Sequence, residues 1–291
     1  MGDKNTGAKV KSESYFTSVW SEFRKNKAAV LGMAILFAII FVAIFADLLA
    51  PCDPYLQVYP EALQHPSAAH LFGTDEFGRD IFSRVLYGAR VSLLVGVVSV
   101  AIACVFGSLL GASAGYFGGT YDAVVMRCID VLLAIPSLLL NLSIVAALGK
   151  SVFNMMLAVG IANIPRYCRI MRASVLQIKN TEYVDAARTS GASNLFIILR
   201  HIIPNCLAPI IVQATLSVGS AIIACAGLSF LGVGIPAPIP EWGAMLSNGK
   251  DFLRHNAYIT IFPGLAIMLT VLSLNLMGDG LRDAFDPKLR R

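Results

Sequence analysis

Long apolar stretches separated by short polar segments dominate the chain, and their lengths are those of membrane-spanning helices. A bilayer core about 30 Å thick requires roughly 20 apolar residues in a helix. Six stretches approach or meet this requirement, and their centres are nearly free of charge. They cover residues 28–50, 91–114, 131–148, 151–165, 206–233 and 257–278. The pattern therefore predicts an all-α integral membrane protein with six transmembrane helices.

The third and fourth stretches have less regular limits than the others. We expect the third helix to begin near Ala123 and to bend at Pro136, since neighbours in a bundle can replace the lost hydrogen bonds. We expect the fourth to continue as a helix past residue 165. Arg166, Arg169 and Arg172 follow there, and three arginines at the midplane would cost nearly ~10 kcal/mol. This row therefore lies at or beyond the membrane surface. We favour a topology anchor over a docking surface or a lipid-headgroup contact.

The distribution of lysine and arginine predicts the orientation. An even number of spans places both termini on one side of the membrane. If that side is the cytoplasm, 17 of the 23 cations lie inside, as the positive-inside rule requires. The outer cations are then Arg79, Arg84, Arg90, Lys150, Lys250 and Arg254. Arg127 and Asp130, one turn apart at the inner end of the third span, are expected to form a local ion pair.

One membrane domain accounts for the chain. We divide it into a cytoplasmic N-terminal tail (1–27), a first anchor helix (28–50), an outer loop (51–90), a five-helix core (91–279) and a cytoplasmic C-terminal tail (280–291). The core includes a cytoplasmic loop, residues 166–205. No A-x-A site ends the first apolar stretch, so we expect an uncleaved signal-anchor helix.

Composition agrees with a membrane protein and excludes several other classes. Hydrophobic residues make up 56% of the chain and charged residues 14%, against about 25% charged residues in soluble domains. The net charge of +5 does not indicate nucleic-acid binding, because the cations alternate with apolar spans. The six cysteines have no metal-ligand spacing, so we expect packing roles and no metal site. Gly149-Lys150-Ser151 lacks the glycine that a phosphate loop needs at position 144.

The loop 166–205 has the sequence signals of two short helices joined at a glycine. Thr181 is placed to cap the first helix, and Gly191 follows its polar end, where glycine tolerates the left-handed conformation. Ser193 or Asn194 can cap a second helix, which Pro204 is expected to end. One side of the first helix carries Tyr183, Ala186 and Ala187, and another carries Glu182, Asp185 and Arg188. The alanines allow another backbone to approach, and the charged row can bind a soluble partner.

Asp185-Ala186-Ala187, followed by Gly191 and Ile203-Pro204, resembles the EAA signature of ATP-binding-cassette importer permeases. In that family the loop carries a helix that docks into a groove on a cytoplasmic ATPase subunit. The resemblance implies that the loop contacts such a subunit through Glu182, Asp185, Ala186, Ala187, Arg188, Gly191, Ile203 and Pro204. Asp185 stands where the family usually has glutamate, which shortens the reach of that carboxylate.

Four further stretches resemble the dipeptide/oligopeptide branch of these permeases. They are LFGTDEFGRDIFSRVLYGARVSLLVG (71–96), GYFGGTYDAVVMRCIDVLLAIPSLLL (115–140), PEWGAML (240–246) and LNLMGDGLRDAFDPKL (274–289). The modest outer loop resembles that of the second, C-type permease of a pair. The resemblance implies a type I importer permease fold and import of di- or oligopeptides, with a nickel chelate or glutathione as the alternative cargo.

The same resemblance implies a set of partners in a bacterial or archaeal cell (inner) membrane. These are a homologous second permease subunit forming a heterodimer, two ATP-binding-cassette ATPase subunits, an extracytoplasmic substrate-binding protein and membrane lipid. ATP and Mg²⁺ would be used by the ATPase subunits, and this chain would bind no cofactor itself. We expect no catalytic residue in this chain and no nucleic-acid partner.

Polar residues within the spans are candidates for the translocation path: Asn141, Gln213, Ser217 and Ser220. The last three share a helix face at i, i+4 and i+7, and the resemblance implies that the fifth span lines the path. For any single residue, an interhelical hydrogen bond worth about 0.6 kcal/mol is the competing interpretation.

The outer segments supply four candidates for an outer gate or a contact with the binding protein: Asp75, Arg79, Glu241 and Trp242. Residues 73–80 alternatively form a glycine-shaped turn in which Arg79 pairs with an acid. Trp242 is alternatively an ordinary anchor at the membrane interface.

Two other classes of membrane protein fit the pattern less well. A secondary transporter usually has ionisable groups near the midplane and internal repeats, neither of which is evident here. An intramembrane enzyme needs a nucleophile and base, or metal ligands, inside a span. The four histidines, however, lie outside the span centres at positions 65, 70, 201 and 255.

Overall fold

The computed structural model describes residues 15–285. Within this range every regular element is a helix, and loops connect the helices. Its long helices are α2 (Lys27–Ile44), α4 (Ile81–Phe117), α7 (Val152–Ile178), α10 (Leu207–Phe230) and α12 (Tyr258–Phe285). Its short helices are α1 (Tyr15–Lys25), α3 (Ala46–Leu49), α5 (Gly119–Ala134), α6 (Ser137–Leu148), α8 (Glu182–Thr189), α9 (Asn194–Ile197) and α11 (Trp242–Gly249). The predicted all-α class is confirmed. Residues 1–14 and 286–291, which belong to the two predicted tails, lie outside the described part.

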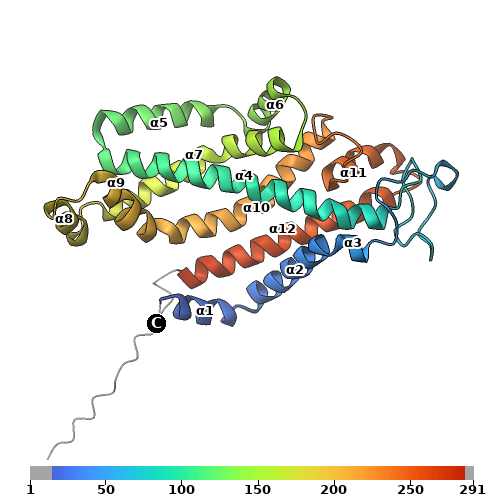
Figure 1. Cartoon of the computed structure of the whole chain (residues 1–291), viewed down its shortest axis with the longest axis horizontal. Helices are drawn as coiled ribbons and strands as arrows, with labels where there is room; N and C mark the ends of the chain where they lie inside the picture. Colours follow the sequence, from blue (N-terminus) through green and yellow to red (C-terminus); the bar gives the residue numbers. More distant parts are fainter. Residues whose placement is uncertain (1–14, 286–291) are drawn as a thin grey trace, which may run out of the picture.

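The long helices form an elongated bundle with two distinct ends (Figure 1). Helices α8 and α9 lie at one end, which we call the α8 end. The segment 50–80 and helix α11 lie at the other, which we call the α11 end. The loop predicted to be cytoplasmic and the loops predicted to be outside are therefore separated by the length of the bundle.

The most extensive helix pair, α4 with α7, packs through a row of glycines. A Cβ atom at Gly111 would lie 2.2 Å from the backbone oxygen of Cys168, and one at Gly107 would lie 2.6 Å from Tyr167 Cβ. Gly115, one turn further along, faces Val175. Small residues at every fourth position let two membrane helices approach closely, and here they fix α7 against α4.

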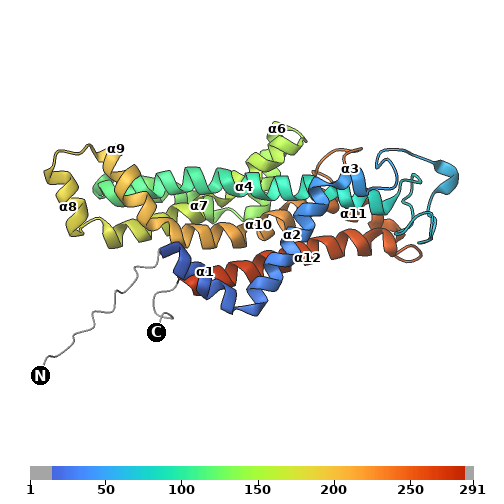
Figure 2. The same ribbon diagram turned by 60° about the horizontal axis from the view of Figure 1, so that its bottom comes forward.

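Helices α1 and α2 lie along α12 on one side of the bundle (Figure 2). Asn26 caps α2 by accepting a hydrogen bond from Ala29 N at 3.1 Å, which separates α1 from α2. A Cβ atom at Gly32 would lie 2.7 Å from Ser273 O, so this glycine allows the close contact with α12. Helix α1 begins at Tyr15, within the segment 1–27 that the sequence assigns to a tail.

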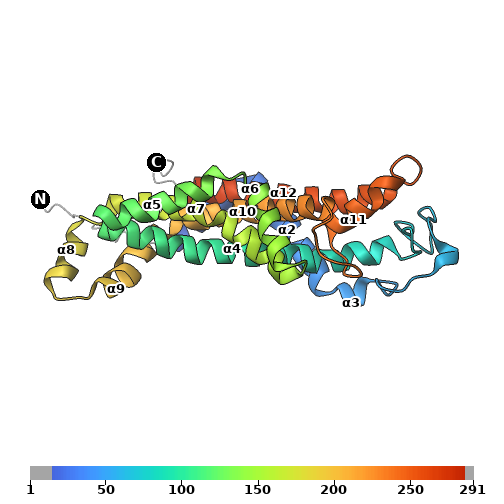
Figure 3. The same cartoon turned by 90° about the horizontal axis from the view of Figure 1, so that it is seen from above.

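The predicted third span is a broken helix. Helix α5 ends at Ala134, α6 begins at Ser137, and the two axes differ by 91° around Pro136. Proline cannot donate the backbone hydrogen bond that a continuous helix needs, which accounts for the break at this position. Figure 3 shows α5 and α6 lying over the α4, α7 and α10 layer. The expected bend is confirmed, but it is far sharper than a kink within one helix.

Within residues 15–285, four helical segments are long and apolar enough to cross a membrane by themselves: α2, α4, the continuous stretch Asn194–Phe230 that ends with α10, and α12. The bent pair of α5 and α6 makes five if it is counted as one span. Helix α7 is not among them, because it continues past residue 165 into the arginine row, as expected from the sequence. The structure therefore establishes a multi-helix membrane protein with four to five apolar spans.

The arginine row of α7 pairs with acids on α5. Arg172 Nη2 donates to Asp122 Oδ2 at 2.6 Å, and Arg169 Nη2 donates to Asp130 Oδ1 at 2.6 Å. The predicted Arg127–Asp130 pair is therefore wrong, because α7 brings Arg169 across to Asp130. Two of these arginines therefore have a structural role, which differs from the topology anchor, the docking surface and the lipid-headgroup contact considered from the sequence. Arg169 and Arg172 attach α5 to α7 near the α8 end of the bundle.

Asp122→Asn is expected to lower the free energy of unfolding by about 1–3 kcal/mol, because Arg172 then loses its charged partner. Asp130→Asn is the matched control. Its ion pair with Arg169 has side chains 43% and 53% exposed, so a loss below about 1 kcal/mol is expected. Thermal denaturation of the purified chain in detergent measures both. Equal losses for the two variants would contradict the structural role assigned to Asp122.

Candidate functional site

At the α8 end, two short helices meet at a glycine as the sequence predicts. Helix α8 ends at Thr189, and Gly191 follows with φ +81°, a conformation that favours glycine. Ser193 caps α9 by accepting a hydrogen bond from Phe196 N at 3.3 Å. Thr181 precedes α8, but its hydroxyl donates to Ile178 O at 2.7 Å and does not cap the helix.

The α8–α9 unit is fixed to the bundle through α4. Val184 is fully buried in the main core, and the hydroxyl of Tyr116 donates to Asn194 Oδ1 at 2.8 Å. The guanidinium carbon of Arg188 lies 5.5 Å from the centre of the Tyr116 ring, and its Nη1 donates to Asp185 Oδ1 at 3.0 Å. Sequence reasoning missed Tyr116 and Val184, since their roles depend on contacts with residues far away in the sequence.

Pro204 does not end the second helix, and that expectation is wrong. Residues Ile198–Ile202 widen into a π-helical turn, and Ile203–Cys206 tighten into a 3-10 turn. Helix α10 then begins at Leu207. The wider turn before Pro204 and the tighter turn that contains it accommodate the missing N–H of the proline, so the chain continues helically into α10. The α8–α9 unit is thereby joined to α10 without a loop.

The outer surface of this unit combines charge with exposed apolar side chains. Glu182, Asp185, Ala186 and Arg188 are exposed, whereas Ala187 is partly buried against the core. Beside them, Tyr183 is 42% exposed, Leu195 66% and Phe196 52%. Apolar side chains of this size on an exposed surface, bordered by charges, are typical of a protein contact. Ile203 is partly buried and Pro204 exposed, both on the stretch leading back to the bundle.

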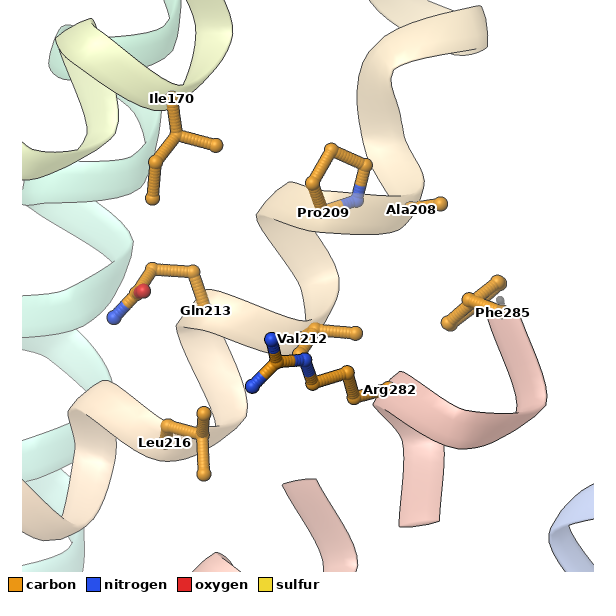
Figure 4. A pocket seen from close by; sticks show the side chains of 8 residues that line it. All are labelled: Ile170, Ala208, Pro209, Val212, Gln213, Leu216, Arg282 and Phe285. Carbon is orange, nitrogen blue, oxygen red and sulfur yellow. The ribbon is translucent and has the colours of Figure 1, made fainter. Parts of the chain in front are cut away.

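A pocket of about 480 Å³ opens among α7, α10 and α12 toward the same end of the bundle. Figure 4 shows its lining residues, with Arg282 extending from α12 toward Val212 and Gln213 of α10. The amide of Gln213 donates to Ser217 Oγ at 2.8 Å, so these two path candidates lie together. The pocket is therefore largely apolar, with one amide and one guanidinium at its wall.

The other two path candidates lie apart from that pocket. Ser220 is exposed on α10, whereas Ser217 is only 1% exposed and lies within the bundle. Asn141 on α6 is 4% exposed, and its Oδ1 atom has no hydrogen-bond partner among the described residues. An unsatisfied buried amide is costly, so this position is a candidate for contact with a further molecule.

At the α11 end, the predicted turn at residues 73–80 is present. Gly73 and Gly78 adopt positive φ, and Arg79 Nε donates to Asp75 Oδ2 at 2.6 Å. The acidic partner expected for Arg79 is thus Asp75. Both side chains are more than nine-tenths buried, so the ion pair is internal.

Glu241 and Trp242 are also internal. The carboxylate of Glu241 accepts hydrogen bonds from Gly243 N at 2.7 Å and Ala244 N at 2.8 Å, which caps α11. Trp242 is 2% exposed, and its indole N–H donates to Val85 O at 2.9 Å. The interpretation of Trp242 as an interfacial anchor is wrong, because the ring is buried against α4 beside Gly88.

Cys52, His70 and Asp80 form a cluster whose potential metal-ligating atoms lie within 4.8 Å of one another. His70 Nδ1 is 3.0 Å from Asp80 Oδ1, and its Nε2 is 3.4 Å from Glu61 Oε2. Both ring nitrogens therefore already face carboxylates. Burial raises the pKa of the Cys52 thiol, which disfavours the thiolate that binds metal. We interpret the cluster as a hydrogen-bond network that closes the loop 50–80.

Comparison with known proteins identifies the class to which this fold and this loop belong. Residues 107–291 match the family of binding-protein-dependent transport system inner membrane components, and the chain belongs to that family. Residues 14–66 match the N-terminal TM domain of oligopeptide transport permease C. The sequence-based recognition of an importer permease of the dipeptide/oligopeptide branch is confirmed.

Three relatives are similar over nearly their whole length. A dipeptide transport system permease protein DppC of Alkalihalophilus pseudofirmus is 48% identical, covering 96% of this chain and 93% of its own. DppC of Escherichia coli K12 is 49% identical, covering 94% and 93%. A glutathione transport system permease protein GsiD of Escherichia coli O6:K15:H31 is 45% identical, covering 93% and 90%.

A solved structure shares the fold. The MetNI methionine ABC transporter in an inward-facing conformation aligns with a TM-score of 0.57 at 16% identity, covering 70% of this chain and 97% of that chain. At this identity the likeness concerns the fold alone. It supports the type I permease architecture expected from the sequence.

Proposed function

We propose that this chain is the membrane-spanning permease subunit of an ATP-driven importer for di- or oligopeptides delivered by an extracytoplasmic binding protein. The observation that carries the proposal is near-full-length similarity, at 48–49% identity, to permeases named for dipeptide transport. Glutathione is the second candidate cargo, since a glutathione permease is 45% identical over most of the chain. Glutathione is itself a small peptide, so one path could serve either cargo.

We propose six spans for this subunit: α2, α4, the broken pair α5–α6, α7, α10 and α12. Helix α7 joins the apolar set because its first half is uncharged and its arginines, which pair with α5, follow at the α8 end. The positive-inside distribution then assigns the α8 end and both termini to the cytoplasm. The α11 end faces the binding protein in the extracytoplasmic space of the bacterial or archaeal cell.

We propose that the exposed surface of α8 and α9 docks onto an ATPase subunit. The contact would combine Tyr183, Leu195 and Phe196 with the charged side chains of Glu182, Asp185 and Arg188. ATP and Mg²⁺ belong to the two ATPase subunits, and this chain supplies neither a nucleotide site nor a catalytic residue. The chain would act with a homologous second permease, so that the substrate path lies between the two and includes the Gln213 pocket.

The attachment of the α8–α9 unit to the bundle provides a route by which movement of the ATPase subunits reaches the membrane helices. When ATP draws the ATPase subunits together, the α8–α9 unit moves with them. Tyr116 connects that unit to α4, Val184 is buried in the main core, and the helical stretch through Pro204 connects the unit to α10. ATP binding would therefore favour one of two arrangements of the bundle, inward-facing or outward-facing, and the loop would transmit that preference.

Crosslinking tests the docking surface. Ala186→Cys, in a chain whose exposed Cys128 is replaced by serine, should crosslink to a co-purified ATPase subunit in at least one nucleotide state. Ala68→Cys is the matched control, because Ala68 is also an exposed alanine but lies at the α11 end and should crosslink to no ATPase. If Ala186→Cys crosslinks in no nucleotide state, the coupling role assigned to this loop is wrong.

A further inference from the structure

A second pocket, of about 230 Å³, lies at the α11 end and is lined by three cationic side chains and no acid. Arg79 precedes α4 and Arg84 lies in its first turn, whereas Lys150 comes from the connection between α6 and α7. The remaining lining, which includes Ser229 and Gly232, is neutral. A cavity with this charge pattern attracts an anion.

The two arginines separate this pocket from the nearby carboxylates. Arg79 is 3% exposed and Arg84 is 4% exposed, and both lie close to the single carboxylate of Asp75. Asp75 Oδ2 accepts from Arg79 Nε at 2.6 Å and lies 3.6 Å from Arg84 Nε. Arg84 Nη1 donates to Pro54 O at 2.8 Å. A guanidinium has five N–H donors, so these contacts leave donors on both arginines for a ligand.

Two further acids, Glu76 and Glu241, lie near these cations but outside the pocket lining. Glu76 Oε1 is 3.7 Å from Arg79 Nη2, and its Oε2 atom is buried without a hydrogen-bond partner among the described residues. Burial raises the pKa of Glu76, which favours its neutral form. Glu241 does not line the pocket, because Ser229, whose hydroxyl donates to it at 2.9 Å, is the lining residue there. The side chains that line the pocket itself therefore carry an excess of positive charge.

Lys150 completes the site at its accessible edge. Its Nζ donates to Gly232 O at 2.6 Å, which holds the ammonium beside the loop after α10. Lys150 is exposed, whereas the arginines are buried, so an incoming group would meet the lysine first. A small chain end can reach the two arginines, and a bulky folded surface cannot.

We propose that this pocket binds the C-terminal carboxylate of the incoming peptide before it enters the path. This inference rests on the proposed peptide import and adds a substrate subsite to it. Every unmodified peptide has such a carboxylate whatever its side chains are, and Arg and Lys are the residues suited to bind it. The subsite would thus retain peptides of varied sequence after release from the binding protein.

The test uses the complete transporter, purified with its partners and reconstituted in liposomes with binding protein and radiolabelled alanyl-alanine. Uptake and ATP hydrolysis are measured together. Lys150→Gln is expected to lower the number of peptides imported per ATP about fivefold, equivalent to ~1 kcal/mol, and Lys150→Glu should lower it further. The binding-protein concentration that half-maximally stimulates ATP hydrolysis should not change.

Lys250→Gln is the matched control, because Lys250 is exposed at the same end but outside the pocket lining, with its ammonium 5.2 Å from the Phe230 ring centre. Uptake per ATP equal to that of the control would overturn the proposal. So would a rise in the half-maximal binding-protein concentration with unchanged uptake per ATP, since the lysine would then contact an acid of that protein. If the unmodified transporter imports no peptide, the proposed function itself fails.

Discussion

Gly191→Pro is expected to reduce ATP-dependent peptide uptake at least about tenfold, equivalent to ~1.4 kcal/mol or more in the activation free energy. Gly191 has φ +81°, whereas the proline ring fixes φ near −65°. Proline also removes the N–H that Gly191 donates to Arg188 O at 3.1 Å. The variant therefore cannot keep α8 and α9 in their present relation, although neither helix loses a side chain.

Gly191→Asn separates the backbone effect from the mere presence of a side chain. A Cβ atom at Gly191 meets nothing within 4 Å, and asparagine tolerates the left-handed region better than most residues do. We expect this variant to retain most of the uptake. Both variants should be compared for co-purification of the ATPase subunits and for thermal stability. Full uptake by Gly191→Pro would show that a fixed α8–α9 geometry is unnecessary for coupling.

The parts of the fold that follow from local chemistry could be predicted. A membrane span needs a long apolar run, so α2, α4, α10 and α12 are evident from the sequence alone. The left-handed Gly191 and a cap at Ser193 or Asn194 likewise follow from rules that involve neighbouring residues only, although the same rules predicted a cap at Thr181 that does not form. These elements include the part of the candidate site that the family resemblance singles out.

The parts that depend on distant contacts could not be predicted. Tyr116 and Asn194 are 78 positions apart, and no periodic pattern connects them. Asp130 has a cation one turn away in sequence, yet α7 supplies its partner, Arg169, from 39 positions away. Both outcomes depend on which helices pack together. The glycine row of α4 allows a close helix contact, but the row does not by itself identify α7 as the helix that makes it.

Glu241 shows that a charged residue in a predicted outer loop can be buried and hold the fold together. As a charged residue in a predicted outer loop it suggests a contact with a soluble protein. The structure places it 1% exposed, with α4, α10 and α11 around it. Its carboxylate accepts from two backbone N–H groups of α11 and from Ser229 of α10, and lies 3.4 Å from Ser92 Oγ of α4. One side chain thus holds three helices together.

Glu241→Ala is therefore expected to lower the free energy of unfolding by about 3 kcal/mol or more, because each buried donor left unpaired costs ~1–3 kcal/mol. Thermal denaturation in detergent measures the loss, and peptide uptake should fall with it. Glu241→Gln keeps one carbonyl acceptor for the start of α11 and should lose less. Glu182→Ala, at an exposed glutamate of the α8 end, should change stability by no more than about 0.5 kcal/mol. Equal stability of Glu241→Ala and Glu182→Ala would exclude the structural role of Glu241 and return it to the candidates for a direct contact with the binding protein.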